Sequence, residues 1–394
     1  MTGFSNVKRL WNPNKCKEDG ALAAIRVLQI MPAMDTGGME TFVMNLYRSI
    51  DREKVQFDFL YHYDKPCFYD REILSLGGQI TKLTVRQDNN LPRYLRELRE
   101  FFTAHPEYRV IHGHYSGFGM FYNTVARKCG VPVRAGHSHN TAYERNLVGQ
   151  LDRVMSSQFD RELTDRFACS QRAGEMLYGS HPFKVLPNGV NTALFARHDP
   201  ADRAALRKEL GVAEDEILFG HVGRFTQQKN HAGLLTLFAS LKKEMPRARL
   251  VLVGGGALEQ QVRQQAKELG LENSVIFAGV RGDMQRFYHA MDVFLLPSLF
   301  EGLPVVLVEA QAAGLPCFVS DTVDPGAAFA KNIHYLPLND TGAWVQSIVT
   351  SDLSRDPDAR SRAIEAGFDV RTSAQYLQNF YLEQYAAHSR EGEA

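Results

Sequence analysis

Short apolar runs rich in β-branched residues alternate with segments of helical periodicity along almost the whole chain. In the first half, the runs that predict strands are 25–31, 55–62, 79–84, 109–115, 133–139, 166–170 and 183–187. In the second half they are 216–223, 249–255, 275–279, 293–298 and 316–321. Because strands and helices alternate, the pattern predicts an α/β protein whose parallel sheets are covered by helices on both faces.

A polar stretch at 191–216, without a predicted strand, separates the two series. We therefore expect two doubly wound domains that face each other across a central cleft, with ligands bound beyond the carboxyl ends of the strands. The expected parts are an N-terminal arm at 1–20, a first Rossmann-like domain at 21–191, a second at 192–370, and a C-terminal helix at 371–394 that packs back on the first domain.

Composition narrows the class of protein. A chain of 394 residues exceeds one core of ordinary size, which agrees with two domains. Lys+Arg and Asp+Glu are equal at 45 each, so no overall basic field favours nucleic acid. The five cysteines are scattered without a Cys-x-x-Cys pair, which indicates reduced thiols. With no signal peptide and no long apolar span, we expect a cytoplasmic protein.

Two glutamates stand in the mostly apolar segment 299–316. Glu301 falls in the turn after a predicted strand, and Glu309 falls inside the helix that we expect to begin at Pro304. A carboxylate near a helix N-terminus is well placed to accept hydrogen bonds from ligand hydroxyls. A solvated helix face would also explain Glu309, but its apolar neighbours favour a buried position.

Two cations and a glycine-rich turn follow other strands of the second half. Arg224 and Lys229 lie in the loop after 216–223, where two fixed cations suit a diphosphate leaving group. Solvated surface charges are the alternative for either residue alone. Gly254, Gly255 and Gly256 follow 249–255 and would let a ligand approach the backbone, although the motif is not Gly-x-Gly-x-x-Gly.

Two His-x-His pairs end strands of the first half, His112 with His114 and His137 with His139. Residues two apart on a strand share a face, so a metal site is one interpretation of these pairs. No His-Glu-x-x-His motif or carboxylate pattern completes such a site, and the sequence leaves the metal interpretation as the weaker one.

In this order and spacing, Gly-Arg-x4-Lys, the glycine-rich turn, Phe-Ala-Gly-Val and Glu-x7-Glu resemble the retaining glycosyltransferases of family 4, which have the GT-B fold. The resemblance covers nearly the whole chain, from Ile25 to Tyr385, and Leu-Pro-Asn-Gly-Val-Asn at 186–191 also matches. It implies transfer of a hexosyl unit, with retention, from a nucleoside-diphosphate sugar to a glycan or lipid-linked glycan, as in cell-surface polysaccharide synthesis. A UDP-sugar is the expected donor.

The resemblance also implies roles for residues of the second half. Arg224 and Lys229 would bind the donor diphosphate, Glu309 the ribose hydroxyls, and Glu301 the donor sugar. The base would lie against the backbone near Val280 and Arg281. Further backbone of the donor site is expected at Gly254, Gly255, Arg281, Gly302 and Leu303.

In the first half, the resemblance places Gly37 and Gly38 in a loop that approaches the donor phosphates and the acceptor. An ordinary tight turn is the alternative for this pair. His137 would meet the donor sugar or the acceptor, with His139 as its rival. No metal or other cofactor is expected, because the nucleotide sugar is a substrate and Asp356-Pro-Asp358 is interpreted as a turn.

Two other functions remain open at this point. A sugar-nucleotide epimerase shares the fold but transfers nothing, and a metal hydrolase could use the four histidines. The segment 91–106 leaves a second question open, because it carries Arg93, Arg96 and Arg99 at helical spacing. A packed helix with a solvated face and peripheral contact with the inner face of a membrane are both compatible with it.

Overall fold

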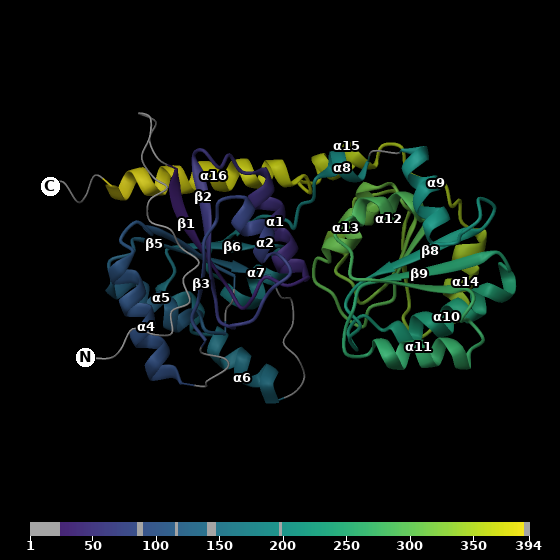
Figure 1. The fold of residues 1–394 in the computed structure, drawn as a ribbon, viewed down its shortest axis with the longest axis horizontal. Coiled ribbons are helices and arrows are strands. Elements are labelled where there is room, and N and C mark those ends of the chain that lie inside the picture. The colour runs from purple at the N-terminus through teal and green to yellow at the C-terminus, as the bar shows by residue number, and fades with distance from the viewer. Residues whose placement is uncertain (1–23, 85–89, 115–116, 140–146, 197–198, 390–394) are drawn as a thin grey trace. The chain divides into compact units, whose positions relative to one another are not determined.

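The computed structural model describes residues 24–84, 90–114, 117–139, 147–196 and 199–389. The expected N-terminal arm at 1–20 lies outside these ranges. The chain forms two compact units (Figure 1). Unit 1 contains Met1–Pro187 and Val370–Ala394, and unit 2 contains Asn188–Asp369. Each unit is a Rossmann-like α/β domain built on a parallel sheet.

Unit 1 has a seven-stranded parallel sheet in the order β3-β2-β1-β4-β5-β6-β7. Its strands are β1 Ile25–Met31, β2 Val55–Tyr61, β3 Ile80–Lys82, β4 Val110–Gly113, β5 Val133–Ser138, β6 Asp165–Ala168 and β7 Lys184–Val185. Its helices are α1 Gly38–Ser49, α2 Asp70–Ser75, α4 Leu91–Ala104, α5 Gly119–Lys128, α6 Leu147–Ser156, the 3-10 turn Phe159–Glu162, α7 Gln171–Tyr178 and α16 Val370–Ser389.

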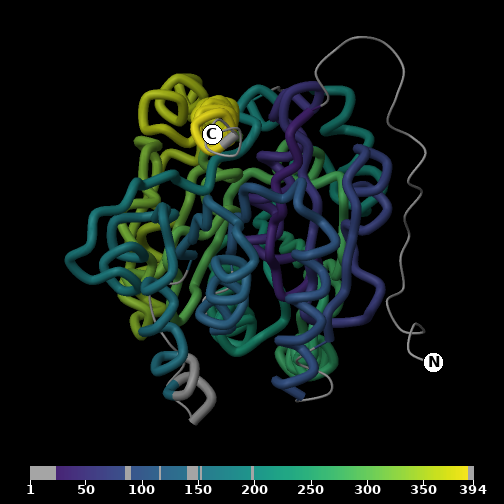
Figure 2. Tube along the Cα trace, turned by 90° about the vertical axis from the view of Figure 1, so that its left-hand side faces the viewer, coloured from purple at the N-terminus to yellow at the C-terminus, as the bar shows by residue number. Residues whose placement is uncertain are grey.

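The last helix, α16, is part of the core of unit 1. It contacts α1 and strands β1, β2 and β4, and Figure 2 shows it end-on in yellow. The Gln378 side chain accepts a hydrogen bond of 2.9 Å from the backbone N–H of Asp51. The buried apolar residues of α16 recur at helical spacing and pack into the core beside the sheet: Val370, Ala374, Leu377 and Tyr381.

Unit 2 has a six-stranded parallel sheet in the order β10-β9-β8-β11-β12-β13. Its strands are β8 Ile217–Val222, β9 Ala248–Val253, β10 Val275–Gly279, β11 Val293–Leu296, β12 Cys317–Ser320 and β13 Ile333–Leu336. Its helices are α8 Thr192–Phe195, α9 Pro200–Glu209, α10 His231–Glu244, α11 Glu259–Glu268, α12 Met284–Ala290, α13 Val305–Ala312, the 3-10 turn Pro325–Ala327, α14 Thr341–Thr350 and α15 Ala359–Glu365.

The predicted strands are confirmed in position, although most end one or two residues earlier than expected. The sequence pattern missed β13, Ile333–Leu336. This strand lies at the sheet edge, and each of its four residues is only partly buried. Its four residues, Ile-His-Tyr-Leu, include a polar histidine and therefore lack the continuous apolar run that favours a strand.

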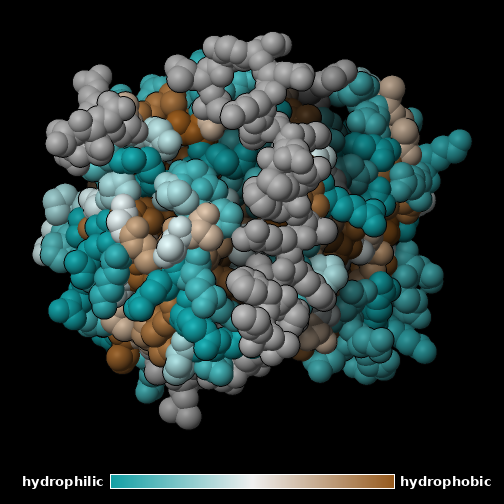
Figure 3. Space-filling model, turned by 60° about the vertical axis from the view of Figure 1, so that its left-hand side comes forward, coloured by the Kyte–Doolittle hydropathy of each residue, from teal (hydrophilic) through white to brown (hydrophobic). Residues whose placement is uncertain are grey.

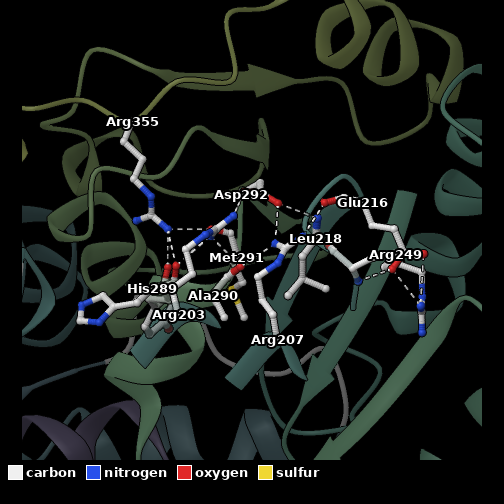
Figure 4. Close-up of polar contacts among 12 residues, drawn as sticks. Arg203, Arg207, Glu216, Leu218, Arg249, His289, Ala290, Met291, Asp292 and Arg355 are labelled. Atoms are coloured by element: carbon white, nitrogen blue, oxygen red, sulfur yellow. Dashed lines mark hydrogen bonds and ion pairs between the residues drawn. The ribbon is translucent and has the colours of Figure 1, made fainter. Parts of the chain in front are cut away.

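A cluster of arginines stabilises unit 2 at the edge of the sheet where the strands begin, opposite their carboxyl ends (Figure 4). The Asp292 carboxylate pairs with Arg203 at 2.6 Å and with Arg207 at 3.0 Å, and it accepts a bond of 2.7 Å from the N–H of Leu218 near the start of β8. Arg203, Arg207 and Arg355 donate to carbonyl oxygens at the carboxyl end of α12. Since terminal helix carbonyls lack partners within the helix, this cluster is structural.

Candidate functional site

The candidate residues of unit 2 gather at one edge of its sheet. Parallel strands present their carboxyl ends together, and β8 lies between β9 and β11 in this sheet. The loop after β8 carries Arg224 and Lys229, and the loop after β11 carries Glu301. The neighbouring loops carry Gly254 and Gly255 after β9, and Val280 and Arg281 after β10.

Lys229 and Glu301 form an ion pair, with Nζ 2.6 Å from Oε1. Both side chains are mostly buried, at 15% and 9% exposure, so solvent screens the pair little. The two loops are also joined by Asn230, whose side-chain amide donates to the carbonyl of Pro297 at 3.0 Å. Asn230 has a left-handed backbone with φ 53°, a conformation that asparagine tolerates better than most residues. The structure thus brings the predicted cation and carboxylate into direct contact.

Arg224 differs from Lys229 in its surroundings. Its side chain is exposed, and within the described part of the chain its guanidinium forms no ion pair or hydrogen bond. The backbone of its loop is nevertheless held in place, because the N–H of Phe225 donates to the carbonyl of Gly255 at 3.0 Å. The loop therefore presents one unengaged cation and one paired cation at the same sheet edge.

The glycine-rich turn after β9 packs against this loop. A Cβ on Gly254 would lie 2.1 Å from the carbonyl oxygen of Gly223, and one on Gly256 would lie 2.7 Å from the backbone nitrogen of Phe225. Gly254 also has φ +140°, which other residues rarely adopt. Because Gly254 and Gly256 have no side chains, the backbone of the loop after β8 packs directly against them. This close packing positions the loop that carries Arg224.

Glu309 is buried, so the solvated-face interpretation is wrong. It is 6% exposed in α13, and its Oε2 accepts a hydrogen bond of 2.8 Å from the Tyr288 hydroxyl. Burial, followed by the charge of Glu309, raises the pKa of Tyr288 well above its usual value, so this hydroxyl stays protonated and donates. Pro304 occupies the N-cap of α13 and not its first helical position, because its ψ of 116° is extended. No pattern in the sequence predicted that Tyr288 is the hydrogen-bond partner of Glu309.

The turn between the two glutamates is anchored from the start of unit 2. Leu303 is buried at 7% exposure, and its carbonyl accepts a hydrogen bond of 3.1 Å from the Asn188 side chain. Gly302 beside it is partly buried. Asn188 lies in the Leu-Pro-Asn-Gly-Val-Asn segment, whose sequence indicated a family resemblance but no role for this side chain. Its amide therefore positions the backbone that follows Glu301.

The loop after β10 has exposed backbone that a ligand could contact, whereas its charged side chain is already paired. Val280 is 51% exposed. The Arg281 guanidinium forms two hydrogen bonds of 2.9 Å with Asp283 and contacts Glu209 at 3.5 Å. The hydrogen bonds from Arg281 lower the pKa of Asp283 to about 2, which keeps this pair ionised. Arg281 is thus already neutralised within unit 2.

In unit 1, Gly37 and Gly38 open α1 after β1. Gly37 is the N-cap, and its carbonyl accepts from the N–H of Thr41 at 2.8 Å. A Cβ on Gly37 would lie 2.3 Å from Oε2 of Glu40, so a larger residue would displace that side chain. Gly38 is exposed at the first helical position. The pair therefore presents open backbone at a helix N-terminus.

The four histidines of the two His-x-His pairs form one stack at the carboxyl ends of β4 and β5. The ring centroids of His112 and His114 are 4.5 Å apart, and those of His137 and His139 are 4.4 Å apart. His137 also lies 5.4 Å from His112 and 5.5 Å from His114. His137 is 2% exposed, and neither of its ring nitrogens has a hydrogen-bond partner among the described residues, whereas His139 is partly exposed.

Burial lowers the pKa of each of these four histidines. The pKa of His112 and of His139 falls to about 3, and that of His114 and His137 falls well below the usual value. Neighbouring histidines lower the values of His112, His114 and His137 further, since two imidazolium charges would repel each other. At neutral pH the stack is uncharged, and each ring carries one nitrogen lone pair.

The arginines of α4 belong to a packed helix. Arg93 pairs with Glu97 at 2.7 Å and Arg96 with Glu100 at 3.9 Å, both along the helix surface. The opposite side buries Tyr94, Leu98, Phe101 and Phe102. The face in Figure 3 shows separate apolar patches between hydrophilic side chains wherever described residues are visible. None of the described helices is long and apolar enough to cross a membrane.

Comparison with protein families agrees with this division of the chain. The family model described as "Glycosyl transferases group 1" matches residues 202–355, which lie in unit 2. The model described as "Glycosyl transferase 4-like domain" matches residues 37–177, which lie in unit 1. The candidate donor residues of unit 2 and the histidines of unit 1 therefore fall inside two glycosyltransferase domains.

Individual relatives extend the likeness over most of the chain. The "Putative glycosyltransferase EpsF" of Bacillus subtilis is 37% identical over 375 residues, covering 90% of this chain and 96% of the relative. The Escherichia coli "UDP-Gal:alpha-D-GlcNAc-diphosphoundecaprenol alpha-1,3-galactosyltransferase" is 28% identical over 70% of this chain and 76% of the relative. HepE of Anabaena, solved in complex with UDP-glucose, has the same fold, with a TM-score of 0.68 at 18% identity over 93% of this chain and 99% of that chain. Given this similarity to EpsF and the two matched domains, the chain belongs to the GT-B glycosyltransferases of the family 4 type.

Proposed function

We propose that this glycosyltransferase moves a hexosyl unit from a UDP-sugar to a glycan or lipid-linked glycan during polysaccharide synthesis, with retention at the anomeric carbon. The names of its relatives support the choice of substrates. The Escherichia coli relative is named for UDP-Gal as donor and a diphosphoundecaprenol-linked acceptor, and HepE was solved with UDP-glucose. The proposed location is the cytoplasm, with peripheral contact at the membrane where a lipid-linked acceptor would lie.

The observation that carries this proposal is the set of charged side chains at the sheet edge of unit 2. Arg224 is an exposed cation without a partner among the described residues, and Lys229 is a mostly buried cation beside Glu301. We assign the donor diphosphate to Arg224 and Lys229 and the donor sugar to Glu301. Glu309, held by Tyr288, is assigned to the ribose hydroxyls. The base is assigned to the exposed backbone near Val280.

The donor backbone completes this assignment. We assign Gly254 and Gly255 to the wall beside the diphosphate and the backbone of Gly302 and Leu303 to the sugar. Arg281 contributes backbone only, since its guanidinium is bound to Asp283. In unit 1, Gly37 and Gly38 are assigned to the loop that approaches the donor and the acceptor.

The proposed reaction is a same-face displacement. The bond between the anomeric carbon and the β-phosphate oxygen breaks, and the acceptor hydroxyl oxygen bonds to that carbon. The acceptor proton passes to an oxygen of the leaving diphosphate. Negative charge grows on the diphosphate as its bond breaks, so Arg224 and Lys229 would stabilise the transition state more than the bound substrate. These two cations would supply the neutralisation, so the proposed transfer needs no metal.

His137 is assigned to the donor sugar or the acceptor. It is neutral, and both of its nitrogens are without a partner among the described residues, so it can donate one hydrogen bond and accept another. His139 is partly exposed and offers the same chemistry two residues further on. His137→Ala and His139→Ala, compared for donor hydrolysis and for transfer, would distinguish their roles.

A panel of nucleotide sugars tests the donor class. A bound donor raises the unfolding temperature in proportion to ln(1 + [L]/Kd), so UDP-sugars should protect the protein more than GDP- or ADP-sugars. UDP release with that donor should then depend on an added lipid-linked acceptor and persist in EDTA. Conversion of the donor to an epimer without acceptor would instead support the epimerase, and EDTA-sensitive release would refute the metal-free mechanism.

A further inference from the structure

Three histidines of unit 1 converge on one buried point. One ring nitrogen from each of His112, His114 and His137 lies within 4.8 Å of the corresponding nitrogens of the other two. His112 and His114 share a face at the end of β4, and His137 follows on the adjacent strand β5. All three side chains are buried, so the protein holds this arrangement by packing.

The outer nitrogens of two of these rings already have partners. His114 Nε2 donates to the side-chain oxygen of Gln29 at 2.8 Å, which leaves Nδ1 with its lone pair. His112 Nδ1 lies 2.5 Å from the Tyr381 hydroxyl, while its Nε2 has no partner among the described residues. Metal-binding histidines usually donate their other N–H to an oxygen, because the contact fixes both tautomer and ring orientation. The Gln29 oxygen accepts from His114 in this way, and the Tyr381 hydroxyl can accept from Nδ1 of His112.

We propose that His112, His114 and His137 bind one divalent transition-metal ion of the zinc class. Imidazole nitrogens suit Zn²⁺, Co²⁺, Ni²⁺ and Cu²⁺, whereas Mg²⁺ and Ca²⁺ prefer oxygen ligands. Three histidines and one water form a known four-coordinate zinc set, so no carboxylate is required. The ion enters from the side of His139, which is partly exposed.

Binding requires a small rearrangement of the rings. Zinc–nitrogen bonds of about 2.0–2.1 Å place tetrahedral ligand nitrogens about 3.4 Å apart, so nitrogens now within 4.8 Å must move by the order of 1 Å. Rotation of an imidazole about its last side-chain torsion has a broad energy minimum, so the torsion itself opposes this movement only weakly. His139 Nε2 lies 3.0 Å from His114 Nδ1 and must give up that contact to the ion.

The ion would act as an inhibitor and not as a cofactor. This consequence rests on the proposed function, in which His137 contacts the sugar or the acceptor. An ion held by His137 would occupy its nitrogen and the adjacent space. Zinc should therefore suppress acceptor-dependent UDP release, and EDTA should restore it.

The test uses untagged protein, since a histidine tag binds the same ions. Calorimetric titration of chelator-treated protein with zinc chloride, without donor or acceptor, should show one site per chain. Cobalt should give the visible absorption bands of a four-coordinate nitrogen site. His137→Ala and His112→Ala should abolish both signals. Absence of binding by the folded wild-type protein, or binding that both variants retain, would overturn the proposal.

A second pair of variants avoids loss of the ligands themselves. Tyr381→Phe removes the oxygen partner of His112 and should weaken zinc binding by about ten- to a hundred-fold. Tyr94→Phe is the matched control, because the Tyr94 hydroxyl bonds His62 at 2.8 Å elsewhere in unit 1. An equal loss in both variants would show a general packing effect and refute the role of Tyr381. Zinc binding without inhibition would refute the role of His137 in transfer but leave the site intact.

Discussion

Lys229 Nζ lies 2.6 Å from Glu301 Oε1, so the mostly buried cation of the candidate donor site carries its own counter-ion. A diphosphate at this edge would meet Arg224, which has no ion-pair partner among the residues that the structure describes, and Lys229, which shares its charge with a carboxylate. The pair also explains how unit 2 tolerates a lysine that is only 15% exposed.

Arg224→Ala should lower kcat by about a hundred- to a thousand-fold, with a smaller rise in the donor KM. Its charge would act mainly on the diphosphate as the glycosidic bond breaks, and losing one such electrostatic donor typically has this effect. Steady-state kinetics with donor and acceptor measure both constants. Arg247→Ala is the control, because Arg247 is 70% exposed and pairs with Asp215 away from the candidate site. A near-normal kcat in folded Arg224→Ala protein would remove Arg224 from the mechanism.

Lys229→Ala should reduce kcat as Arg224→Ala does, but it should also destabilise unit 2. It leaves Glu301 mostly buried without its counter-ion, a change that costs about 3 kcal/mol or more. Lys229→Ala combined with Glu301→Gln should recover stability but not kcat. Urea unfolding and kinetics on the single and double variants separate the two effects. Recovery of kcat in the double variant would show that Lys229 serves only to neutralise Glu301.

Glu309→Ala should weaken binding of free UDP by roughly ten- to a hundred-fold. Loss of a charged hydrogen-bond partner typically costs about 1.5–3 kcal/mol, and the ribose would be present in UDP itself. Glu301→Ala should leave UDP affinity nearly unchanged but lower turnover, since Glu301 is assigned to the sugar. Calorimetric titration of both variants with UDP decides between these roles. Similar losses in both would contradict the division.

Tyr288→Phe should reduce UDP affinity by about two- to tenfold without changing the fold. The variant keeps the ring but removes the hydroxyl that donates to Glu309 Oε2, a hydrogen bond worth about 0.5–1.5 kcal/mol. The effect should vanish in a Glu309→Ala background, because Tyr288 would act only through that carboxylate. Tyr178→Phe in unit 1, which removes a hydroxyl bonded to Phe167, is the control. An undiminished effect in the double variant would exclude a positioning role.

Acid should destabilise unit 2 through His231. Burial, followed by the charge of Lys229, lowers its pKa from 6.5 to about 4, and its ring stacks on Phe225 and contacts His221. Below pH 6.5, His231 is therefore mostly protonated in the unfolded state but stays neutral in the folded state until the pH approaches 4. The free energy of unfolding should fall by up to about 3 kcal/mol between pH 6.5 and pH 4 from this residue. Above about pH 7.5 the unfolded histidine is also neutral, so this residue then contributes no pH dependence.

Urea unfolding of wild-type protein and His231→Gln between pH 4 and pH 7.5 measures this contribution. The variant should lose less stability on acidification, while the residual slope includes His221 and the four stacked histidines of unit 1, whose pKa values burial also lowers. Parallel curves for the two proteins would show that His231 does not govern the acid sensitivity.

The sequence alone determined the alternation of strands and helices, because each buried strand and each amphipathic helix carries its own periodicity. It also placed Arg224, Glu301 and the His-x-His pairs at strand ends, since that position depends only on where an apolar run stops. β13 escaped detection because His334 interrupts its short apolar run. Such patterns depend only on the residues of one helix or strand and not on the elements that pack against it.

Only the tertiary structure decided which of these strand ends meet. Lys229 reaches Glu301 because β8 and β11 are neighbours in the sheet, and His137 joins His112 because β5 lies beside β4. Gln29 and Tyr381 reach the histidines from β1 and from the last helix. Strand order arises from the packing of whole elements, and no local periodicity records it. The sequence therefore identified most residues of the candidate site, and the packing of the elements determined which of these residues contact each other.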